Sequence, residues 1–281
     1  MGARFEDRRI SVSVAETGAE PQLLVVEPEA ERDLESLHVT DLAYSPSQHA
    51  AYVGTCCEPG SGHLLKVDTM APERGLQQDD QGFAVDVGGP LLLFARTDTW
   101  GTFAVRTSSS EKPDLREGAG ITDVAVEQGS LTRVIGLIDS KRLRSLIPTA
   151  PRPAATSHDP GILVREQKAP GKWADTTYPL SDDNTYCRVV PLAGGDVGLL
   201  AGTVEPLSPW RCTGDTLVVY DLARKQTRTD ALALPSRVQH LSIDESSTFV
   251  IFTTVEGAVG WRTLDGRGGT LAESGFVAAD W

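Results

Sequence analysis

The chain has 281 residues, a formal net charge of −13 and an isoelectric point near 4.8. An acidic surface of this kind repels nucleic acid and anionic membranes, so we expect no nucleic-acid partner. Hydrophobic residues make up 40% of the chain, enough for a folded core, which excludes disorder of the whole chain.

No apolar run approaches the roughly 20 residues of a membrane helix, so we expect no membrane span in this chain. The first residues, 1–8 (MGARFEDR), lack the apolar stretch of a signal peptide. The protein is therefore either cytoplasmic, or a leader or anchor lies outside this sequence.

At the N-terminus, residues 10–15 (ISVSVA) and 22–28 (QLLVVEP) are predicted to be the second and third strands of a sheet. Residues 29–37 follow as one of two places where a short helix is expected.

Five later segments repeat one pattern, in which a short apolar strand, a polar turn and a more apolar strand follow one another. They are residues 41–55 (DLAYSPSQHAAYVGT), 83–96 (FAVDVGGPLLLFAR), 123–137 (DVAVEQGSLTRVIGL), 189–203 (VVPLAGGDVGLLAGT) and 240–254 (HLSIDESSTFVIFTT). A third strand is predicted after most of them, at 63–68, 101–107, 216–222 and 258–266. Most copies recur after roughly 40–50 residues, a spacing typical of β-propeller blades, each a four-stranded sheet that stacks against its neighbours.

Residues 139–160 (DSKRLRSLIPTAPRPAATSHDP) are predicted to be a proline-rich insertion between two strands of one blade, with a second short helix at 140–146. The final segment, 275–281 (GFVAADW), reads as an innermost strand. Joined to the N-terminal strands, it would close the ring and remove two open sheet edges.

We therefore predict an all-β fold, a single six-bladed β-propeller over residues 1–281. The expected blades are 8–37 with 274–281, then 38–80, 81–118, 119–181, 182–235 and 236–273. Seven blades are the alternative if the insertion hides further strands, and a many-stranded β-sandwich is the competing architecture.

Residues 42–54 (LAYSPSQHAAYVG) resemble the W-S-P-D-G signature of TolB-type and WD-repeat-like bacterial propellers, with Gln48 and His49 in place of the usual Asp-Gly turn. Residues 276–281 (FVAADW) resemble the same signature cut off at its tryptophan. The run Cys56-Cys57-Glu58-Pro59 resembles a motif of secreted propellers from high-GC bacteria. The resemblance implies a ring of six or seven blades and an exported protein, and it implies no reaction.

The four cysteines, Cys56, Cys57, Cys187 and Cys212, allow three disulfide pairings. In the predicted propeller all four lie on one face, the loop face, which carries the loops between second and third strands and the entries to first strands. A Cys187–Cys212 bond and a vicinal Cys56–Cys57 bond fit this placement and an oxidising compartment. The alternative is four reduced thiols in a cytosolic protein.

The loop face also carries the candidate ligand- or partner-binding residues, chosen because exposed aromatic and basic side chains are typical binding anchors. These candidates are Trp100, Trp210, Arg211, Arg142, Arg144, Glu58 and His63. The tryptophans could equally cap blade cores, and the basic residues of the insertion could pair with the protein's own carboxylates.

Asp41 and Asp123 hold equivalent positions at the starts of first strands. Carboxylates near a channel could perform acid–base chemistry on a carbohydrate, or could simply repeat because the blade repeats. The histidines, at 38, 49, 63, 158 and 240, are isolated, and no metal site, catalytic signature or cofactor motif is present.

The sequence thus favours a non-enzymatic interaction module of the bacterial cell envelope, monomeric and without cofactor, that binds a protein or a glycan. The alternatives are a carbohydrate-active propeller enzyme that uses channel carboxylates, and a cytoplasmic scaffold.

Overall fold

The computed structural model describes residues 2–6, 9–14, 22–26, 38–56, 62–71, 74–75, 77–96, 103–107, 114–116, 120–127, 132–146, 159–169, 172–181, 183–205, 208–244 and 246–280. Up to residue 26 and at a few later positions only the backbone is described. None of the helices formed by these residues is long and apolar enough to cross a membrane.

The described elements are almost all short strands. In the first half of the chain they are β1 (Gly2–Glu6), β2 (Arg9–Val14), β3 (Gln22–Val26), β4 (His38–Ser45), β5 (Ala50–Cys56), β6 (Leu64–Asp68), β7 (Gln77–Asp80), β8 (Ala84–Gly88), β9 (Leu91–Ala95), β10 (Phe103–Thr107), β11 (Asp114–Arg116), β12 (Ile121–Glu127) and β13 (Arg133–Ile138). In the second half they are helix α1 (Ser140–Leu146), β14 (Gly161–Ala169), β15 (Lys172–Pro179), β16 (Thr185–Pro191), the 3-10 turn η3 (Ala193–Gly195), β17 (Val197–Glu205), β18 (Ser208–Asp221), β19 (Gln226–Ile243), β20 (Phe249–Thr254), β21 (Val259–Thr263), β22 (Gly268–Ala272) and β23 (Ala278–Ala279).

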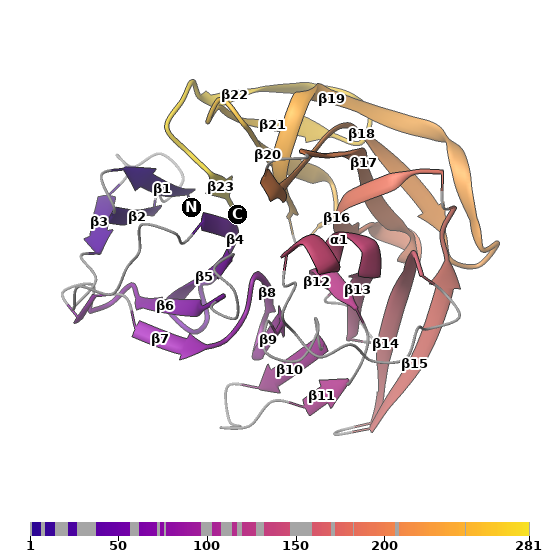
Figure 1. Cartoon of the computed structure of the whole chain (residues 1–281), viewed down its shortest axis with the longest axis horizontal. Helices are drawn as coiled ribbons and strands as arrows, with labels where there is room; N and C mark the ends of the chain where they lie inside the picture. Colours follow the sequence, from indigo (N-terminus) through magenta and orange to yellow (C-terminus); the bar gives the residue numbers. More distant parts are fainter. Residues whose placement is uncertain are drawn as a thin grey trace.

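These strands form antiparallel sheets that surround a common centre (Figure 1). Four sheets have four strands, in the orders β23-β1-β2-β3, β4-β5-β6-β7, β8-β9-β10-β11 and β12-β13-β14-β15, and one has seven, β16 to β22 in sequence. Six strands lie nearest the centre, and we call them the innermost strands: β4, β8, β12, β16, the second half of β19, and β23. They contact one another in succession, β4 with β8, β8 with β12, β12 with β16, β16 with β19, β19 with β23 and β23 with β4. The all-β prediction and the helix expected at 140–146 are confirmed.

The seven-stranded sheet departs from the two separate blades that the sequence predicts there. Strand β19 is 18 residues long and pairs with both β18 and β20, so the expected boundary between 235 and 236 falls inside a strand. The strand is irregular at this boundary, because Arg237 has a left-handed backbone (φ 59°) and the pairing register shifts between Val238 and His240. The two halves of β19 can therefore face different neighbours while remaining one hydrogen-bonded strand.

The N-terminal strands also differ from the prediction in their order within the sheet. Strand β1 lies between β23 and β2, so β2 is the third strand of this sheet and β3 the fourth, whereas the sequence predicts a second and a third. The pattern missed β1 because GARFE is short and three of its five residues are charged or glycine. The C-terminal segment does pair with the N-terminal sheet, as predicted, because Gly2 of β1 pairs with Ala279 of β23. The helix expected at 29–37 lies outside the described residues.

The core lies between adjacent sheets. Strands β5 and β9 are buried along their whole length, which is why they read as apolar runs rather than as alternating patterns. One cluster joins Leu93 of β9 with Ile121, Val134 and Leu163 of the next sheet. Burial of each such side chain contributes about 1.5–3 kcal/mol, so the packing of neighbouring sheets holds the innermost strands in place.

Candidate functional site at the axial channel

Four aspartates connect the innermost strands to one another around the centre. Each carboxylate accepts a hydrogen bond from a backbone N–H of a neighbouring innermost strand. The pairs are Asp280 with Tyr44 (2.8 Å), Asp41 with Val85 (3.0 Å), Asp86 with Val126 (2.7 Å) and Asp123 with Val189 (2.7 Å). An innermost strand lies at the edge of its sheet, where outward N–H groups lack a ladder partner, and these carboxylates satisfy them.

Arg188 of β16 joins two of these carboxylates. Its Nη1 lies 2.8 Å from Asp123 Oδ1 and 3.4 Å from Asp41 Oδ2. Its Nε donates to the Gln239 carbonyl at 3.1 Å, and its Nη2 donates to the Thr40 carbonyl. One buried guanidinium thus bridges strands β4, β12, β16 and β19 across the channel.

The two carboxylates respond differently to their surroundings. Burial raises the pKa of Asp123 to about 6, although Arg188 opposes the shift. Burial also acts to raise the pKa of Asp41, but Arg188 and a hydrogen bond from His240 outweigh it and hold that pKa below its usual value. Burial would lower the pKa of Arg188, yet the charges of Asp41 and Asp123 raise it. Arg188 therefore stays charged, and Asp41 is its ionised partner.

His240 completes this network from the last innermost strand before β23. Its ring is buried, and Nε2 lies 2.7 Å from Asp41 Oδ1. The isolated histidine of the sequence is therefore a buried partner of a channel aspartate.

A cavity of about 480 Å³ lies on one side of this network. Its lining comes from the second halves of the innermost strands and the turns that follow them, including Ser47, Gly89, Glu127, Pro191 and Ser247. We call this end of the channel the turn face, because the turns between first and second strands surround it. The walls and floor include Asp41, Asp86, Asp123, Asp244 and Asp280.

Asp86 and Asp280 give the cavity its negative character. Burial, reinforced by the nearby charge of Asp280, raises the pKa of Asp86 well above its usual value. Within the described part of the chain, Asp86 accepts hydrogen bonds from the backbone N–H groups of Val87 and Val126 and makes no ion pair with a cation. A positively charged group in the cavity would favour the ionised form of Asp86.

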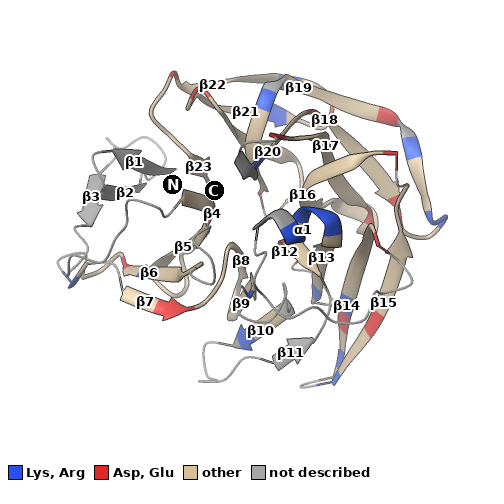
Figure 2. Ribbon diagram, viewed as in Figure 1, with Lys and Arg blue, Asp and Glu red and all other residues tan. Residues whose placement is uncertain are grey.

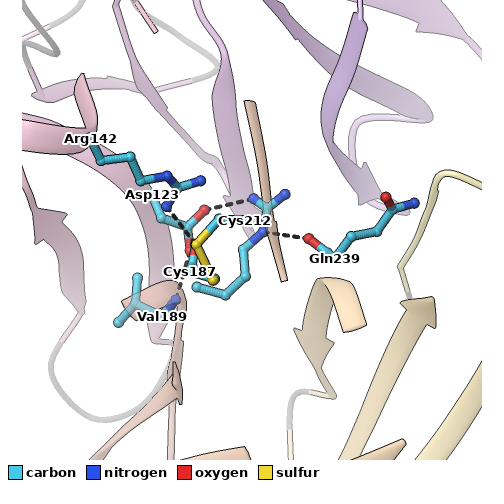
Figure 3. The surroundings of a disulfide bond; sticks show 7 residues. Asp123, Arg142, Cys187, Val189, Cys212 and Gln239 are labelled. Atoms are coloured by element: carbon cyan, nitrogen blue, oxygen red, sulfur yellow. Dashed lines mark hydrogen bonds and ion pairs between the residues drawn. A yellow bond between two sulfur atoms is a disulfide. The ribbon is translucent and has the colours of Figure 1, made fainter. Parts of the chain in front are cut away.

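The opposite end of the channel, the loop face, is covered by α1 and the start of β18. Arg142 of α1 is buried and donates from Nη1 to the Cys187 carbonyl at 2.9 Å. Cys187 is bonded to Cys212 of β18, with an S–S distance of 2.08 Å, the pairing that the sequence analysis favours. Figure 3 shows Arg142, Asp123 and the disulfide side by side.

The candidate binding residues of the insertion divide between core and surface. Figure 2 shows helix α1, whose ribbon is largely coloured for Lys and Arg, near the centre of the molecule. Arg144 is exposed, whereas burial lowers the pKa of Arg142 to about 10. The expectation that Arg142 is an exposed anchor is therefore corrected, because its guanidinium is buried and donates to the Cys187 carbonyl.

The remaining candidates do not gather into one described site. Arg211 is half-exposed and lies 3.8 Å from Glu205, and His63 is partly buried with its backbone N–H donating to Thr55. Cys56 is disulfide-bonded. Trp100, Glu58 and Cys57 lie outside the described residues, as does the side chain of Trp210, so their roles stay predictions.

Sequence reasoning singled out Asp41 and Asp123 but missed Arg188, Asp86 and Asp280. The sequence did contain a signal for this network. Arg188 and His240 stand at the same place in their first strands as Asp41 and Asp123 do in theirs. A single basic residue at the place of a repeated acidic one indicates charge pairing across a closed repeat. No group of three or more potential metal ligands occurs within the described part of the chain.

No protein-family model matches the chain, and no curated protein sequence matches it. Solved structures do. The chain is similar to TolB from Acinetobacter baumannii (TM-score 0.58, 13% identity), covering 98% of this chain and 64% of that one. It is also similar to the structure of U3-55K (TM-score 0.52, 10% identity, 82% and 65% covered) and to the Cps50 (Swd1) β-propeller domain of Myceliophthora thermophila (TM-score 0.50, 13% identity, 80% and 65% covered).

The fold is a β-propeller. At these identities the likeness concerns the fold alone, and the chain spans just under two thirds of the length of each of these structures. The propeller fold explains the channel, because radial sheets bring their first strands together around one axis.

Proposed function

We propose that residues 1–281 form one six-bladed propeller closed by β23. The support is the unbroken succession of contacts between first strands and the pairing of β23 with β1. The seven-stranded sheet then corresponds to two blades that share β19, which bends at Arg237. A crystal structure with seven sheets around the axis would contradict this count.

The propeller acts as a monomeric, non-enzymatic interaction module whose partner is a protein. The observation that carries this proposal is the acidic cavity on the turn face, whose walls are innermost strands and the short turns that follow them. A rigid, preformed cavity reduces the conformational cost of binding. The partner is a protein rather than a neutral glycan, because the cavity is lined by several carboxylates, including Asp86, Asp244 and Asp280, and these favour the ammonium or guanidinium of a lysine or arginine.

Peptides test this proposal directly. Titration with short neutral peptides carrying one arginine, one lysine or one glutamate should show binding of the two basic peptides, weakened by salt. The Asp86→Asn variant should bind them at least about fivefold more weakly, since it removes one wall charge at roughly 1 kcal/mol. Asp230→Asn, which alters an exposed carboxylate on β19 that does not line the cavity, is the matched control.

The loop-face candidates provide the competing location. Arg211→Glu reverses a half-exposed charge at the other end of the channel and should leave peptide binding unchanged. Loss of binding in Arg211→Glu with full binding in Asp86→Asn would place the partner on the loop face instead.

We further propose that the protein works in the cell envelope or outside the cell. The support is the Cys187–Cys212 bond and the absence of free thiols among the cysteines that the structure describes. Thiol titration of protein isolated from its native compartment should find Cys187 and Cys212 oxidised. Free thiols at both positions would favour the cytoplasmic alternative.

The second candidate function is a carbohydrate-active enzyme, and one observation favours it. Asp86 and Asp280 both line the cavity, and the raised pKa of Asp86 is the property that a general acid requires. Hydrolysis of aryl glycosides by the wild-type protein, lost in Asp86→Asn, would support this function over binding alone. If the wild-type protein hydrolyses no aryl glycoside in this assay, the result supports the interaction module.

A further inference from the structure

Strands β17 and β18 continue past the part of their sheet that pairs regularly. We call residues 202–205 of β17 and 208–214 of β18 the hairpin extension. Its strands remain paired from Gly202 with Gly214 to Glu205 with Ser208, after a register shift between Ala201 and Gly202. The extension is thus an antiparallel two-stranded ribbon at one end of the sheet.

Two glycines define where the ribbon begins. A Cβ atom on Gly202 would lie 2.0 Å from the Thr213 carbonyl oxygen, and one on Gly214 would lie 2.1 Å from the Ala201 carbonyl oxygen. Only hydrogen fits at these two paired positions, so the strands approach unusually closely there. This pinch separates the extension from the sheet below it.

The extension reaches across the loop-face end of the channel. Strand β18 contacts both α1 and β4, although β4 belongs to a different sheet (Figure 1). Burial, together with the charge of Arg211, lowers the pKa of His38 at the start of β4. With α1, the extension therefore covers the end of the channel opposite the cavity.

Covalent and non-covalent ties hold the extension in this position. Glu205 makes exposed ion pairs with Arg211 and Arg237, which contribute little to stability in water. Beneath it, Arg142 is a buried cation close to Arg188, and its Nε has no hydrogen-bond partner among the described residues. Apolar packing of Val204 and Cys212 against the core also holds the base of the extension. The covalent tie is the bond from Cys212 to Cys187 on innermost strand β16.

We propose that the Cys187–Cys212 disulfide is a latch that keeps the hairpin extension closed over the loop-face end of the channel. With the latch formed, a ligand reaches the Arg188 network only through the turn-face cavity. With the latch absent, the extension opens about the Gly202–Gly214 pinch while the sheets stay folded. This inference is independent of the peptide-binding proposal, because it concerns access from the other face.

Labelling of one thiol tests the latch in the folded protein. In the Cys212→Ser variant, Cys187 is a free thiol that is fully buried while the extension is closed. We expect a maleimide to label Cys187 at least about tenfold faster than global unfolding allows, and peptide mass identifies the labelled residue. The labelling rate should not change with urea concentration at low urea. Labelling that rises with urea in parallel with global unfolding would overturn the proposal.

Hydrogen exchange supplies the second measurement and its internal control. Amides of residues 208–214 should exchange faster in the Cys212→Ser variant than in the wild type, whereas residues 216–221 of the same strand should be unchanged. Equal exchange in 208–214 would overturn the latch. So would a Cys212→Ser variant that does not fold, because the disulfide would then be required by the whole sheet.

Discussion

Arg188 Nη1 donates to Asp123 Oδ1 at 2.8 Å and so ties strand β16 to strand β12 of the neighbouring sheet. Both side chains are buried, and Asp41 from a third sheet shares the same guanidinium. The centre of the molecule is therefore held by charge as well as by apolar packing. Because these residues line or underlie the cavity, its shape depends on their remaining paired.

Replacing Arg188 with methionine should lower the free energy of unfolding by about 3–5 kcal/mol, because Asp41 and Asp123 would remain buried without their cation. Urea denaturation at pH 7 measures the loss. Arg228→Met, which removes a half-exposed guanidinium paired with Asp230, should leave stability essentially unchanged. Equal losses in the two variants would mean that the buried network does not stabilise the fold.

Stability should depend on pH in a defined direction. The pKa of Asp123 is about 6 in the folded chain against 3.8 for an ordinary aspartate, and that of Asp86 is also raised. The folded state therefore binds these protons more tightly, and the free energy of unfolding should rise as pH falls from 7 towards 5. Each group contributes a slope of at most about 1.4 kcal/mol per pH unit within this window.

Asp41 has the opposite effect on the pH dependence of stability. Its pKa is lowered, so the stability it contributes is present above the ordinary aspartate value and is lost as pH falls through the lowered one. Thermal unfolding between pH 3 and pH 8 should show a maximum on the acidic side of neutrality. A continuous fall in stability from pH 7 to pH 5 would contradict the assignment of Asp123 and Asp86.

Asp86→Asn should stabilise the protein at pH 7.5. The amide oxygen of asparagine can still accept from Val126, at the loss of the local bond from Val87, while the repulsion by Asp280 at this buried position disappears. The melting temperature should therefore rise at pH 7.5, and the gain should shrink as pH falls. Asp230→Asn, at an exposed ion pair, serves as the control and should lack the gain. A lower melting temperature in Asp86→Asn would show that its carboxylate is needed in the charged form.

The glycine pinch makes a steric prediction. Gly202→Ala and Gly214→Ala should each cost about 2 kcal/mol or more, because the new Cβ would overlap a backbone carbonyl that cannot move without breaking the ladder. Gly269→Ala is the matched control, since its nearest neighbour is the side chain of Trp261 at 3.0 Å. Chemical denaturation of the three variants distinguishes the cases, and a cost for Gly269→Ala equal to the others would contradict the steric account.

Local patterns in the sequence predicted most of the strands and the helix at 140–146. The paired apolar segments appear as β4–β5, β8–β9, β12–β13 and β16–β17, because turn residues and alternating or continuous apolar runs are short-range signals. The charged segment that became β1 was missed for the same reason, since its strand character comes from pairing with β2 and β23. Pairing of that kind joins residues from the two ends of the chain.

The sequence by itself determined an acidic, all-β chain of repeated strand pairs, with aspartates recurring at the starts of first strands. Only the tertiary structure decided that Asp41 and Asp123 share Arg188, that Arg142 is buried, and that Asp86 and Asp280 line one cavity. The physical reason is that hydrophobic periodicity is set by neighbours two residues apart. The charge state and partners of a channel residue are set by strands more than 40 residues away, which meet only when the sheets are arranged around an axis.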